Sequence, residues 1–333
     1  MEFKDTFLPT AEKLETWLEL QEGGPITDLI EHSLLAPLNE FLSRPGKSIR
    51  GKLVELGFQL VNRESEGKKC LAAAAQVLET IHAASLVVDD IQDNSEWRRG
   101  QPTLHRTHGI AVALNSANWL YFWPFEKIQS WKIGAEEKAR LNSACNRALI
   151  KAHSGQALDV GTPIHKLEKP RIYSVCLASL ELKTGALTAL ALELGAILAG
   201  ATESQIQSLS RFGLEFGIAL QMFDDLGNVG QKNPPDSKRF EDLKLGRPSW
   251  IWATASQILS DKEFEEFLEL VAILPEEREL SAYFNNVKWV QESKAGASEY
   301  LDRAVSKLTK ESWSQTALND LCALVDQLKK AYD

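Results

Sequence analysis

Apolar residues recur every three or four positions along most of this chain, which is the spacing of amphipathic α-helices. The clearest runs are long enough to form complete helices, and they cover residues 70–90, 134–160, 170–200, 202–228 and 293–331. No segment alternates apolar and polar residues between hairpin turns, so we expect no β-strands. The pattern therefore predicts an all-α protein of roughly a dozen helices.

Short turns separate the predicted helices, and none of them resembles a linker between domains. Glycine and proline, the residues typical of tight turns, occur together at 23–25, 45–46 and 100–102. The longest irregular segment spans residues 229–247 and carries two adjacent prolines. A loop of that length inside a compact domain is usually functional or disordered. We expect residues 1–333 to form one helical domain.

Composition narrows the partners that the protein can have. The net charge is −9, which disfavours nucleic acid and anionic membranes as main partners. The four cysteines form no CxxC pair, which fits reduced thiols in a cytoplasmic setting. No stretch approaches the roughly 18 apolar residues of a membrane span. The N-terminus also lacks the pattern of a signal peptide.

Asp89, Asp90 and Asp93 form an acidic cluster at the end of a strongly apolar predicted helix. Asp89 and Asp93 are four residues apart, which puts both carboxylates on one helix face. The two carboxylates repel each other, and the negative end of the helix dipole adds to that cost. A divalent cation relieves both costs, and Mg²⁺ commonly binds one or two carboxylates plus substrate phosphates. Taken alone, such a cluster is more often a solvated helix end.

Three neighbouring features favour a metal site over a solvated helix end. Residues 83–88 are apolar, so the cluster ends a buried helix. Arg98 and Arg99 follow closely, and guanidinium groups match the geometry of phosphates. A second acidic pair, Asp224 and Asp225, ends another long apolar helix. If the two helix ends face each other, they form a cavity with acidic walls that suits a metal-bound diphosphate.

Two further segments are candidates for contacts with anions. Lys47 and Arg50 lie three residues apart at a predicted helix start, where backbone N–H groups favour anions. A solvated helix N-terminus is the more common explanation of such a pair. Lys183-Thr184-Gly185 interrupts an apolar helical stretch, where a glycine costs about 1 kcal/mol relative to alanine. A break there would expose carbonyl groups to a cavity, and a simple helix end is the alternative.

A resemblance to a known family rests on the segments PGKSIRGKL, HAASLVVDDIQDNSEWRRGQPTLH, GIAVALNSANWLYFWPFEKI, GQALD, LKTGAL, QMFDDLGN and FEDLKLGRPSW. In this order they resemble the trans-isoprenyl diphosphate synthases, from about residue 37 to the C-terminus. The resemblance is closest to the eukaryotic-type (type III) geranylgeranyl diphosphate synthases, because DDIQDNS is followed by RRG and the second acidic motif ends in Asn228. It implies a helical bundle around a central active-site cavity. It also implies condensation of isopentenyl diphosphate with an allylic prenyl diphosphate.

The family implies about three Mg²⁺ ions that bridge the allylic diphosphate. Asp89 and Asp93 would hold two of these ions, and Asp224 would hold the third. The residues expected to support them indirectly are Asp90, Asp225 and Asp242. The residues expected to line the reacting centre are Gln156, Asp159, Thr184 and Gln221. Asn228 removes one acidic charge and is expected to weaken the third metal site.

The same resemblance assigns the basic residues to the two substrates. The expected contacts of the allylic diphosphate are Arg98, Lys183 and Lys238. The expected contacts of isopentenyl diphosphate are Lys47, Arg50, His82 and Arg99. Two positions depart from the family: Ser48 stands where a second basic residue is usual, and Arg247 stands where lysine is usual. Arg247 stays a candidate substrate contact, since arginine keeps the charge but changes its geometry.

The expected chemistry is ionisation of the allylic substrate, attack by the double bond of isopentenyl diphosphate and loss of a proton. Carbonyl groups at Lys183 and Thr184 and the amide oxygen of Gln221 would face the carbocation, so these three residues join the aspartates as expected catalytic residues. We assign no residue as the general base, because the released diphosphate is expected to take the proton.

Product length should follow the depth of the apolar cavity. Ala84 and Ser85 are small and lie one turn before Asp89, so a growing chain would pass them. The expected floor is an aromatic group on the next helix, and its members are Trp119, Tyr121, Phe122 and Trp123. Ordinary core packing is the other explanation of these aromatic residues. We expect a C20 product, with C15 and C25 as alternatives.

Two alternative functions use the same scaffold. A terpene cyclase would keep the metal site but would not need the isopentenyl diphosphate residues, which are all present here. A non-catalytic subunit typically loses an acidic motif, and both motifs are largely intact here. The family also suggests a homodimer or a larger homo-oligomer.

Overall fold

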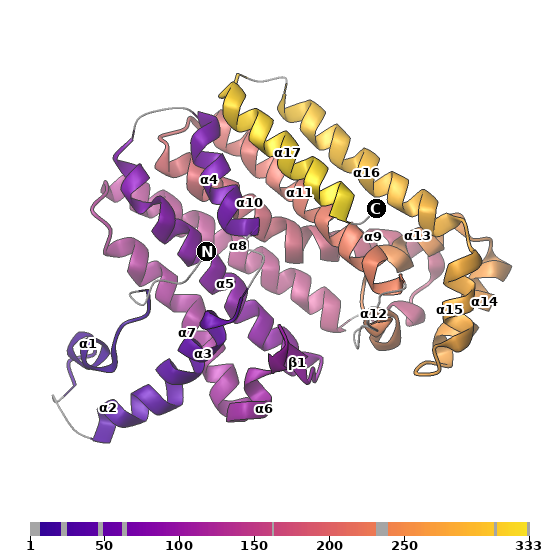
Figure 1. Ribbon diagram of the computed structural model, residues 1–333, viewed down its shortest axis with the longest axis horizontal. Coiled ribbons are helices and arrows are strands. Elements are labelled where there is room, and N and C mark those ends of the chain that lie inside the picture. The colour runs from indigo at the N-terminus through magenta and orange to yellow at the C-terminus, as the bar shows by residue number, and fades with distance from the viewer. Residues whose placement is uncertain are drawn as a thin grey trace.

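Helices account for most of this computed structural model (Figure 1). It describes residues 7–20, 25–45, 49–61, 65–161, 163–230, 239–309 and 312–331. The high helical content confirms the prediction of an all-α protein. The expected absence of strands is corrected by one short antiparallel hairpin, β1 (Trp97–Arg98) and β2 (Gln101–Pro102). Its two-residue turn is possible because Arg99 and Gly100 both have positive φ angles, 54° and 75°.

The helices follow one another with short connections. The N-terminal part contains α1 (Ala11–Trp17), α2 (Pro25–Ile30), the π-helix η1 (Glu31–Leu35), α3 (Ala36–Ser43) and α4 (Ile49–Val61). The middle part before the hairpin contains the 3-10 helix η2 (Glu66–Cys70) and α5 (Leu71–Gln92). After the hairpin come α6 (Leu104–His108), α7 (Ile110–Gln129), α8 (Ala135–Gly161), the 3-10 helix η3 (Ile164–Lys166) and α9 (Lys169–Leu180).

The chain then runs through the π-helix η4 (Glu181–Gly185) into α10 (Ala186–Leu198) and α11 (Glu203–Val229). The last elements are α12 (Glu241–Leu245), α13 (Trp250–Ile258), α14 (Asp261–Ala272), α15 (Arg278–Asn286), α16 (Trp289–Leu308) and α17 (Gln315–Ala331). These elements outnumber the predicted dozen, because several are short helices inside segments where the sequence shows no periodicity.

The long periodic runs correspond closely to α5, α8 and α11. A capping box at Thr202 and Gln205 fixes the start of α11, since each side chain satisfies a backbone N–H of the other. The run at 293–331 is divided into α16 and α17. The division occurs where the backbone N–H of Ser314 donates to the carbonyl of Leu60, which fastens the connection to α4.

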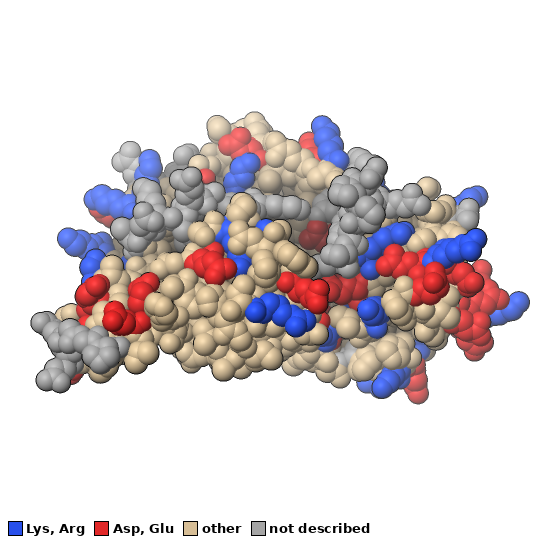
Figure 2. Space-filling model, turned by 60° about the horizontal axis from the view of Figure 1, so that its bottom comes forward, with Lys and Arg blue, Asp and Glu red and all other residues tan. Residues whose placement is uncertain are grey.

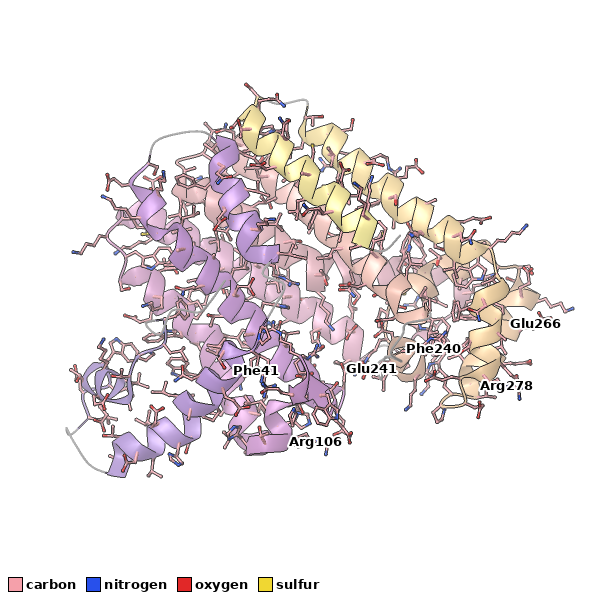
Figure 3. The ribbon with its side chains drawn as sticks, in the orientation of Figure 1. Phe41, Arg106, Phe240, Glu241, Glu266 and Arg278 are labelled. Atoms are coloured by element: carbon pink, nitrogen blue, oxygen red, sulfur yellow. The ribbon has the colours of Figure 1, made fainter. Side chains whose placement is uncertain are left out.

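The centre of the core is α10, whose residues are all buried except Glu193. Two glycines allow α4 and α10 to pack with their backbones in contact. A Cβ atom on Gly195 would lie 2.0 Å from the carbonyl oxygen of Val54, and one on Gly57 would lie 2.5 Å from that of Leu192. Larger residues at these two positions would push the helices apart. Outside the contact between α4 and α10, the core also includes Phe41 and Phe240, which are labelled in Figure 3.

Two helical segments, Glu66–Gln92 and Lys169–Leu198, are long and apolar enough to cross a membrane by length and composition alone. This corrects the expectation that no stretch approaches that composition. Their most apolar windows are 50% and 67% buried inside the structure. A helix that packs on several faces needs few charges, so central core helices reach the same hydropathy as a membrane span.

Acidic side chains gather at the end of the molecule that contains α14 and α15 (Figure 2). The exposed carboxylates of α14 are Asp261, Glu263, Glu265, Glu266 and Glu269. None of them lines the cavities described below. This group of exposed carboxylates therefore lies away from the candidate site.

Candidate active site

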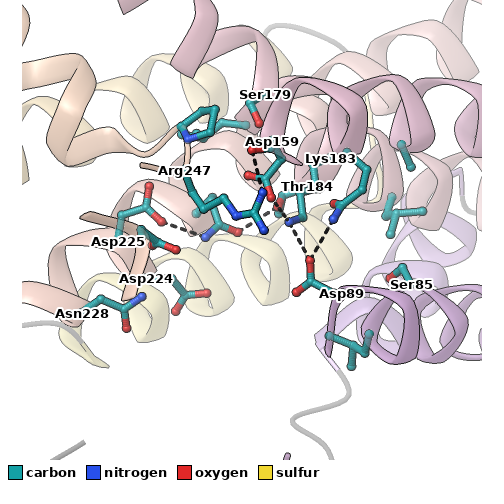
Figure 4. A pocket seen from close by; sticks show the side chains of 18 of the residues that line it. Ser85, Asp89, Asp159, Ser179, Lys183, Thr184, Asp224, Asp225, Asn228 and Arg247 are labelled. Carbon is teal, nitrogen blue, oxygen red and sulfur yellow. Dashed lines mark hydrogen bonds and ion pairs between the residues drawn. The ribbon is translucent and has the colours of Figure 1, made fainter. Parts of the chain in front are cut away.

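A cavity of about 1280 Å³ lies at the carboxyl-terminal ends of α5 and α11. Its acidic side chains are Asp89, Asp93, Asp159, Asp224, Asp225, Glu241 and Asp242. Its basic side chains are Arg50, Arg98, Lys183, Arg247 and Lys294. Figure 4 shows Asp89 on one side of the space and Asp224 on the other. The two acidic helix ends that the sequence singles out thus line one cavity.

The carboxylates of the first cluster are paired with cations from other elements. The Asp89 carboxylate accepts from Lys183 Nζ at 3.0 Å and from Gln156 Nε2 at 3.1 Å. Asp93 Oδ1 lies 2.5 Å from Arg247 Nη2. Each of these two carboxylates therefore has a partner on a different helix or loop.

Asp90 points away from its two neighbours, because successive helix residues are about 100° apart. Its Oδ1 accepts from Arg98 Nε at 2.8 Å, and the side chain is 1% exposed. Arg98 also lies 3.8 Å from Asp89. Asp90 is therefore placed to orient Arg98 toward the cavity, and it does not itself line that cavity.

The pKa values of Asp89 and Asp93, the two cavity-facing carboxylates of this cluster, are shifted in opposite directions. Burial opposes ionisation of Asp89, but the charges of Lys183 and Arg98 and two hydrogen bonds outweigh it and lower the pKa of Asp89. Burial and the nearby charge of Asp89 raise the pKa of Asp93 despite the contact with Arg247. Asp93 is therefore the carboxylate whose negative charge is less well compensated.

The helix around Lys183 and Thr184 does not break; it widens into the π-turn η4 between α9 and α10. The sequence left a break or a helix end as the alternatives, so this is a correction. Glycines of both neighbouring helices touch the turn. A Cβ on Gly155 would lie 2.6 Å from Lys183 N, and one on Gly217 would lie 3.0 Å from Thr184 O. A π-turn perturbs the regular backbone hydrogen bonds and is common at functional sites.

A chain of hydrogen bonds fixes the amide of Gln221 on α11. Its Oε1 accepts from the hydroxyl of Thr184 at 2.8 Å, and its Nε2 donates to Asp225 Oδ1 at 2.8 Å. Asp225 Oδ2 in turn accepts from the backbone N–H of Trp250 at 2.6 Å. When Asp225 is ionised its carboxylate can only accept hydrogen bonds, so the amide nitrogen of Gln221 faces it.

The second acidic wall is more deeply buried than the first. Burial and the charge of Asp242 raise the pKa of Asp225 well above its usual range. Burial, followed by the charge of Asp159, raises the pKa of Asp242 to about 6. Asn228 donates a hydrogen bond to Asp242, which opposes that rise. A cation held in this part of the cavity would favour the ionised forms of both groups.

A second cavity of about 880 Å³ adjoins the first and shares Arg50, His82, Leu86, Arg98, Thr184, Gln221, Asp224 and Ala331 with it. Its other charged lining residues are Lys52, Glu79 and Arg99. Arg99 Nη1 donates to the carbonyl of Arg44 at 3.3 Å, which anchors the hairpin beside this cavity.

His82 is neutral in the wall between the two cavities. Burial, then the charges of Arg50, Arg99 and Arg98, hold the pKa of His82 well below its usual range. His82 Nε2 lies 3.1 Å from Arg50 Nη1, so Nε2 accepts and Nδ1 carries the proton. His82 Nδ1 and Arg50 Nε are buried without a hydrogen-bond partner in the described part of the chain.

The structure brings most of the expected site residues to these cavities. Those that line the first cavity are Arg50, His82, Ser85, Asp89, Asp93, Arg98, Gln156, Asp159, Lys183, Thr184, Gln221, Asp224, Asp225, Asp242 and Arg247. Arg99 lines the second cavity only. The predicted contacts Lys47 and Lys238 lie outside the described residues.

The expected floor of the apolar cavity needs correction. Phe122 is 72% exposed, and Trp119 stacks on Trp123 at 4.9 Å, packed toward the N-terminal helices. Ala84 is fully buried in the core and does not line the cavity. Ser85 and Tyr121, which were also expected here, do line the cavity. Adjacent positions on a helix point about 100° apart, so Ala84 and Phe122 face away from it.

Sequence reasoning missed several residues that line the cavities. His153 on α8 packs edge-on against the ring of Tyr121 at 4.8 Å and lines the apolar part. Glu79 lies on the same face of α5 as His82, so helical spacing could have indicated it. Val290, Gln291 and Lys294 come from α16, and the sequence carried no signal that placed that distant helix here.

The donor atoms suit a hard divalent cation. Among the described residues, no three His, Cys, Asp or Glu side chains come close enough together to hold a metal ion by themselves. Asp89 and Asp93 supply carboxylate oxygens from one side of the cavity and Asp224 from the other. Mg²⁺ commonly binds few protein carboxylates and completes its shell with phosphate oxygens and water. The residues present therefore fit magnesium bound together with a diphosphate.

Comparison with known proteins gives one consistent group. Residues 31–286 match the family model described as polyprenyl synthetase. Geranylgeranyl pyrophosphate synthase penG of Penicillium ochrochloron is 34% identical over 65% of this chain, and the match spans 57% of that relative. Geranylgeranyl pyrophosphate synthase spyE of Aspergillus fumigatus is 30% identical over 88% of this chain and 76% of its own length.

Solved structures share the same helical arrangement. Geranylgeranyl pyrophosphate synthetase from Pyrococcus horikoshii Ot3 superposes with a TM-score of 0.74 at 25% identity, covering 96% of this chain and 94% of that one. A decaprenyl diphosphate synthase from Rhodobacter capsulatus gives a TM-score of 0.75 at 22% identity, covering 97% and 95%. At 22% identity, the likeness to the decaprenyl diphosphate synthase concerns the fold alone.

Proposed function

This chain belongs to the polyprenyl synthetase family, and from that premise we propose that it condenses isopentenyl diphosphate with an allylic prenyl diphosphate. The reaction would be a Mg²⁺-dependent head-to-tail transfer that gives geranylgeranyl diphosphate and releases diphosphate. The observation that carries the proposal is the pair of joined cavities, one with acidic and basic groups together and one that is mainly basic. Two diphosphate substrates need two such sites with a shared wall.

The first cavity would hold the allylic diphosphate. Asp89, Asp93 and Asp224 are the residues that would hold the magnesium ions, about three by family resemblance. Bound magnesium would neutralise charge on the departing diphosphate. Arg98 and Lys183 would donate to the same phosphate oxygens, and fixed donors of this kind stabilise charge as it develops. Lys238 remains an expected contact from the sequence.

The second cavity would hold isopentenyl diphosphate. Arg50 and Arg99 supply positive charge there, and His82 offers the proton on Nδ1 as a donor. Lys47 is expected to join them. Arg50, His82 and Arg98 line both cavities, so the two substrates would lie on either side of one wall.

The wall between the cavities would face the carbocation. Gln221 presents its amide oxygen toward Thr184, since its nitrogen is fixed on Asp225. That oxygen and the carbonyls of the π-turn would provide electron density without becoming attached to the cation. Gln156 and Asp159 hold Lys183 and Asp89 in place around the same point. The proton lost at the end would pass to the released diphosphate.

The apolar arm of the first cavity would hold the growing chain. Its lining residues include Ser85, Leu149, Ala152, Leu180 and Leu187, and the Tyr121–His153 pair lies among them. We propose that this pair stops elongation at C20. C15 and C25 products correspond to a shallower and a deeper stop.

A second copy of the chain would cover α7 and α8. The residues Ile110, Leu114, Phe122 and Ile150 on these helices are between 40% and 72% exposed. Exposed apolar side chains on neighbouring helices mark an interaction surface. We propose a homodimer through this face, in a cytoplasmic enzyme whose four cysteines carry free thiols.

Product analysis tests the proposed function. Purified protein would be incubated with Mg²⁺, isopentenyl diphosphate and C5, C10 or C15 allylic primers, and the products measured by mass spectrometry. We expect a C20 diphosphate from the accepted primers and no product when magnesium is chelated. A cyclic hydrocarbon formed from the allylic primer alone would contradict the proposal and favour a cyclase.

A further inference from the structure

Arg247 joins three separate elements at the edge of the first cavity. Its Nη2 lies 2.5 Å from Asp93 Oδ1, at the end of α5. Its Nη1 donates to the backbone carbonyl of Asp159 at 3.1 Å, in the last turn of α8. The Arg247 side chain is 13% exposed and that of Asp93 is 14% exposed. The Asp93 carboxylate is therefore held by a largely buried guanidinium group.

The backbone on either side fixes where this guanidinium can reach. Gly246 ends α12 with a φ angle of 67°, and its carbonyl accepts from the N–H of Ile164 at 2.9 Å. The N–H of Arg247 donates to the carbonyl of Asp242 at 2.8 Å. The side chain therefore starts from a rigid point and extends across the cavity edge to α5 and α8.

The two contacts require the shape of arginine. A guanidinium group presents separate N–H donors in a planar fork, whereas an ammonium group is a single point charge. The carbonyl of Asp159 lies in the last turn of α8, where carbonyl groups have no partner within the helix. Lysine, the residue usual in the family at this position, could not hold the carbonyl and Asp93 with two nitrogen atoms.

The partners of the two cavity-facing aspartates differ in number. Asp89 contacts Lys183, Arg98 and Gln156. For Asp93, Arg247 is the one cation within ion-pair distance in the described part of the chain. A divalent cation that binds the same oxygen of Asp93 must therefore compete with Arg247. The displaced guanidinium group would keep Asp159 as a pivot and would still border the cavity that Lys183 and Arg98 line.

We propose that Arg247 is a positioning residue that competes with divalent metal for Asp93 and exchanges this carboxylate for a phosphate oxygen when metal and diphosphate bind together. The proposal rests on the proposed function, in which Asp93 holds metal. Metal alone breaks an ion pair without replacing it, whereas metal with diphosphate gives the guanidinium group a new anionic partner. Arg247 should thus oppose binding of metal alone and favour binding of the metal–diphosphate pair.

Binding measurements on the full chain test this exchange without any turnover. Mn²⁺ binding would be followed by electron paramagnetic resonance, with and without saturating inorganic diphosphate, for wild type, Arg247→Gln and Arg247→Lys. Without diphosphate, we expect Arg247→Gln to bind Mn²⁺ about tenfold more tightly than wild type. With diphosphate, we expect the same variant to bind Mn²⁺ about tenfold more weakly. In both conditions, the Mn²⁺ affinity of Arg247→Lys should lie between those of wild type and Arg247→Gln, because lysine keeps the charge but loses the second contact.

The matched control is Arg140→Gln, which removes an arginine from an exposed ion pair with Glu203 on the surface. It should leave both Mn²⁺ affinities unchanged. If Arg247→Gln weakens Mn²⁺ binding in both conditions, or changes neither, the exchange is refuted. If its melting temperature shows that Arg247→Gln does not fold, Arg247→Lys is measured in its place. It should show the same two changes, tighter Mn²⁺ binding without diphosphate and weaker Mn²⁺ binding with it. Absence of Mn²⁺-dependent diphosphate binding in wild type would instead refute the metal site itself.

Discussion

Single charged residues of the first cavity are compensated by partners on other helices. Lys183 Nζ lies 3.0 Å from Asp89 and 2.9 Å from Asp159, and Arg98 pairs with Asp90. These contacts hold the side chains in place before any substrate contact. A change of one carboxylate should therefore affect chemistry much more than folding.

We expect Asp89→Asn to reduce kcat by at least about 100-fold, because it removes a metal-binding charge while keeping the shape of the side chain. The helical circular-dichroism spectrum should stay as in wild type. Steady-state product formation under saturating magnesium provides the measurement. Asp302→Asn, on the exposed face of α16, is the matched control and should keep wild-type turnover. Wild-type turnover in Asp89→Asn would remove the metal-site account.

His82 predicts a specific dependence of stability on pH. Its pKa in the folded protein is well below the ordinary value of 6.5, because it is buried beside arginines. Below pH 6.5 the unfolded chain takes up a proton that the folded chain does not, so this contribution to stability falls as pH falls. Between pH 7.0 and pH 5.5, the loss in unfolding free energy should be about 1 kcal/mol smaller in His82→Gln than in wild type. Urea unfolding at the two pH values measures it, and equal losses would contradict the assignment of a neutral His82.

Residue positions fixed by helix geometry could be predicted from the sequence, and those fixed by packing could not. Asp89 and Asp93 share a face because they are four residues apart on one helix. The choice between Tyr121 and Phe122 as a lining residue depends on how α7 is rotated against α8. No pattern within either helix determines that rotation, so the predicted floor included an exposed residue.

At the scale of elements, the π-turn η4 is the feature that the whole site is built around. It presents Lys183 to α5 and α8, and it presents Thr184 to α11. Glycines in α8 and α11 allow both helices to approach this turn. The sequence showed an unusual glycine at 185 but could not distinguish a wide turn from a helix end, since both need the same local interruption.

Gly155→Ala tests how closely α8 must pack on this turn. The added methyl would lie 2.6 Å from Lys183 N and 2.8 Å from the carbonyl carbon of Leu182, so either α8 or the turn must move. We expect a loss of about 1–3 kcal/mol in unfolding free energy. A fall in kcat should accompany it, because Lys183 and Thr184 shift.

The matched control for Gly155→Ala is Gly296→Ala in α16, where no heavy atom lies within 4 Å of the new methyl. This control should be neutral or stabilising by up to about 1 kcal/mol, since alanine is the better helix former. Chemical denaturation of both variants gives the comparison. Equal stability of the two variants would show that the contact between α8 and the turn is not tight.

At the scale of the whole molecule, the cavities exist because helices far apart in sequence meet at their ends. The fold class and the periodic runs that form α5, α8 and α11 were predictable, because periodicity is a local property of the chain. The hairpin, α12 and the contribution of α16 to the cavity were not, because they depend on tertiary contacts between segments that carry no periodic signal.

Cavity depth depends on α5, α7 and α8 together, and it should set product length. Ser85→Phe places a ring in the apolar arm and should shorten the main product, whereas His153→Ala removes part of the floor and should lengthen it. Mass spectrometry of the products from one primer measures both changes.

Ala84→Phe is the matched comparison for Ser85→Phe. Because Ala84 lies in the core and not in the cavity wall, Ala84→Phe should mainly destabilise the fold. Product lengths that stay the same in both cavity variants would place the stop elsewhere.

The central claim is that one cavity binds a diphosphate through metal and the adjoining cavity binds a second diphosphate through basic residues alone. Calorimetric titration of isopentenyl diphosphate and of a non-reactive allylic thiodiphosphate, each with Mg²⁺ and with chelator, tests it most directly. Chelation should weaken binding of the allylic analogue at least about 100-fold, equivalent to about 2.7 kcal/mol, and change the affinity for isopentenyl diphosphate only a few-fold. Equal dependence of both ligands on magnesium would contradict the account.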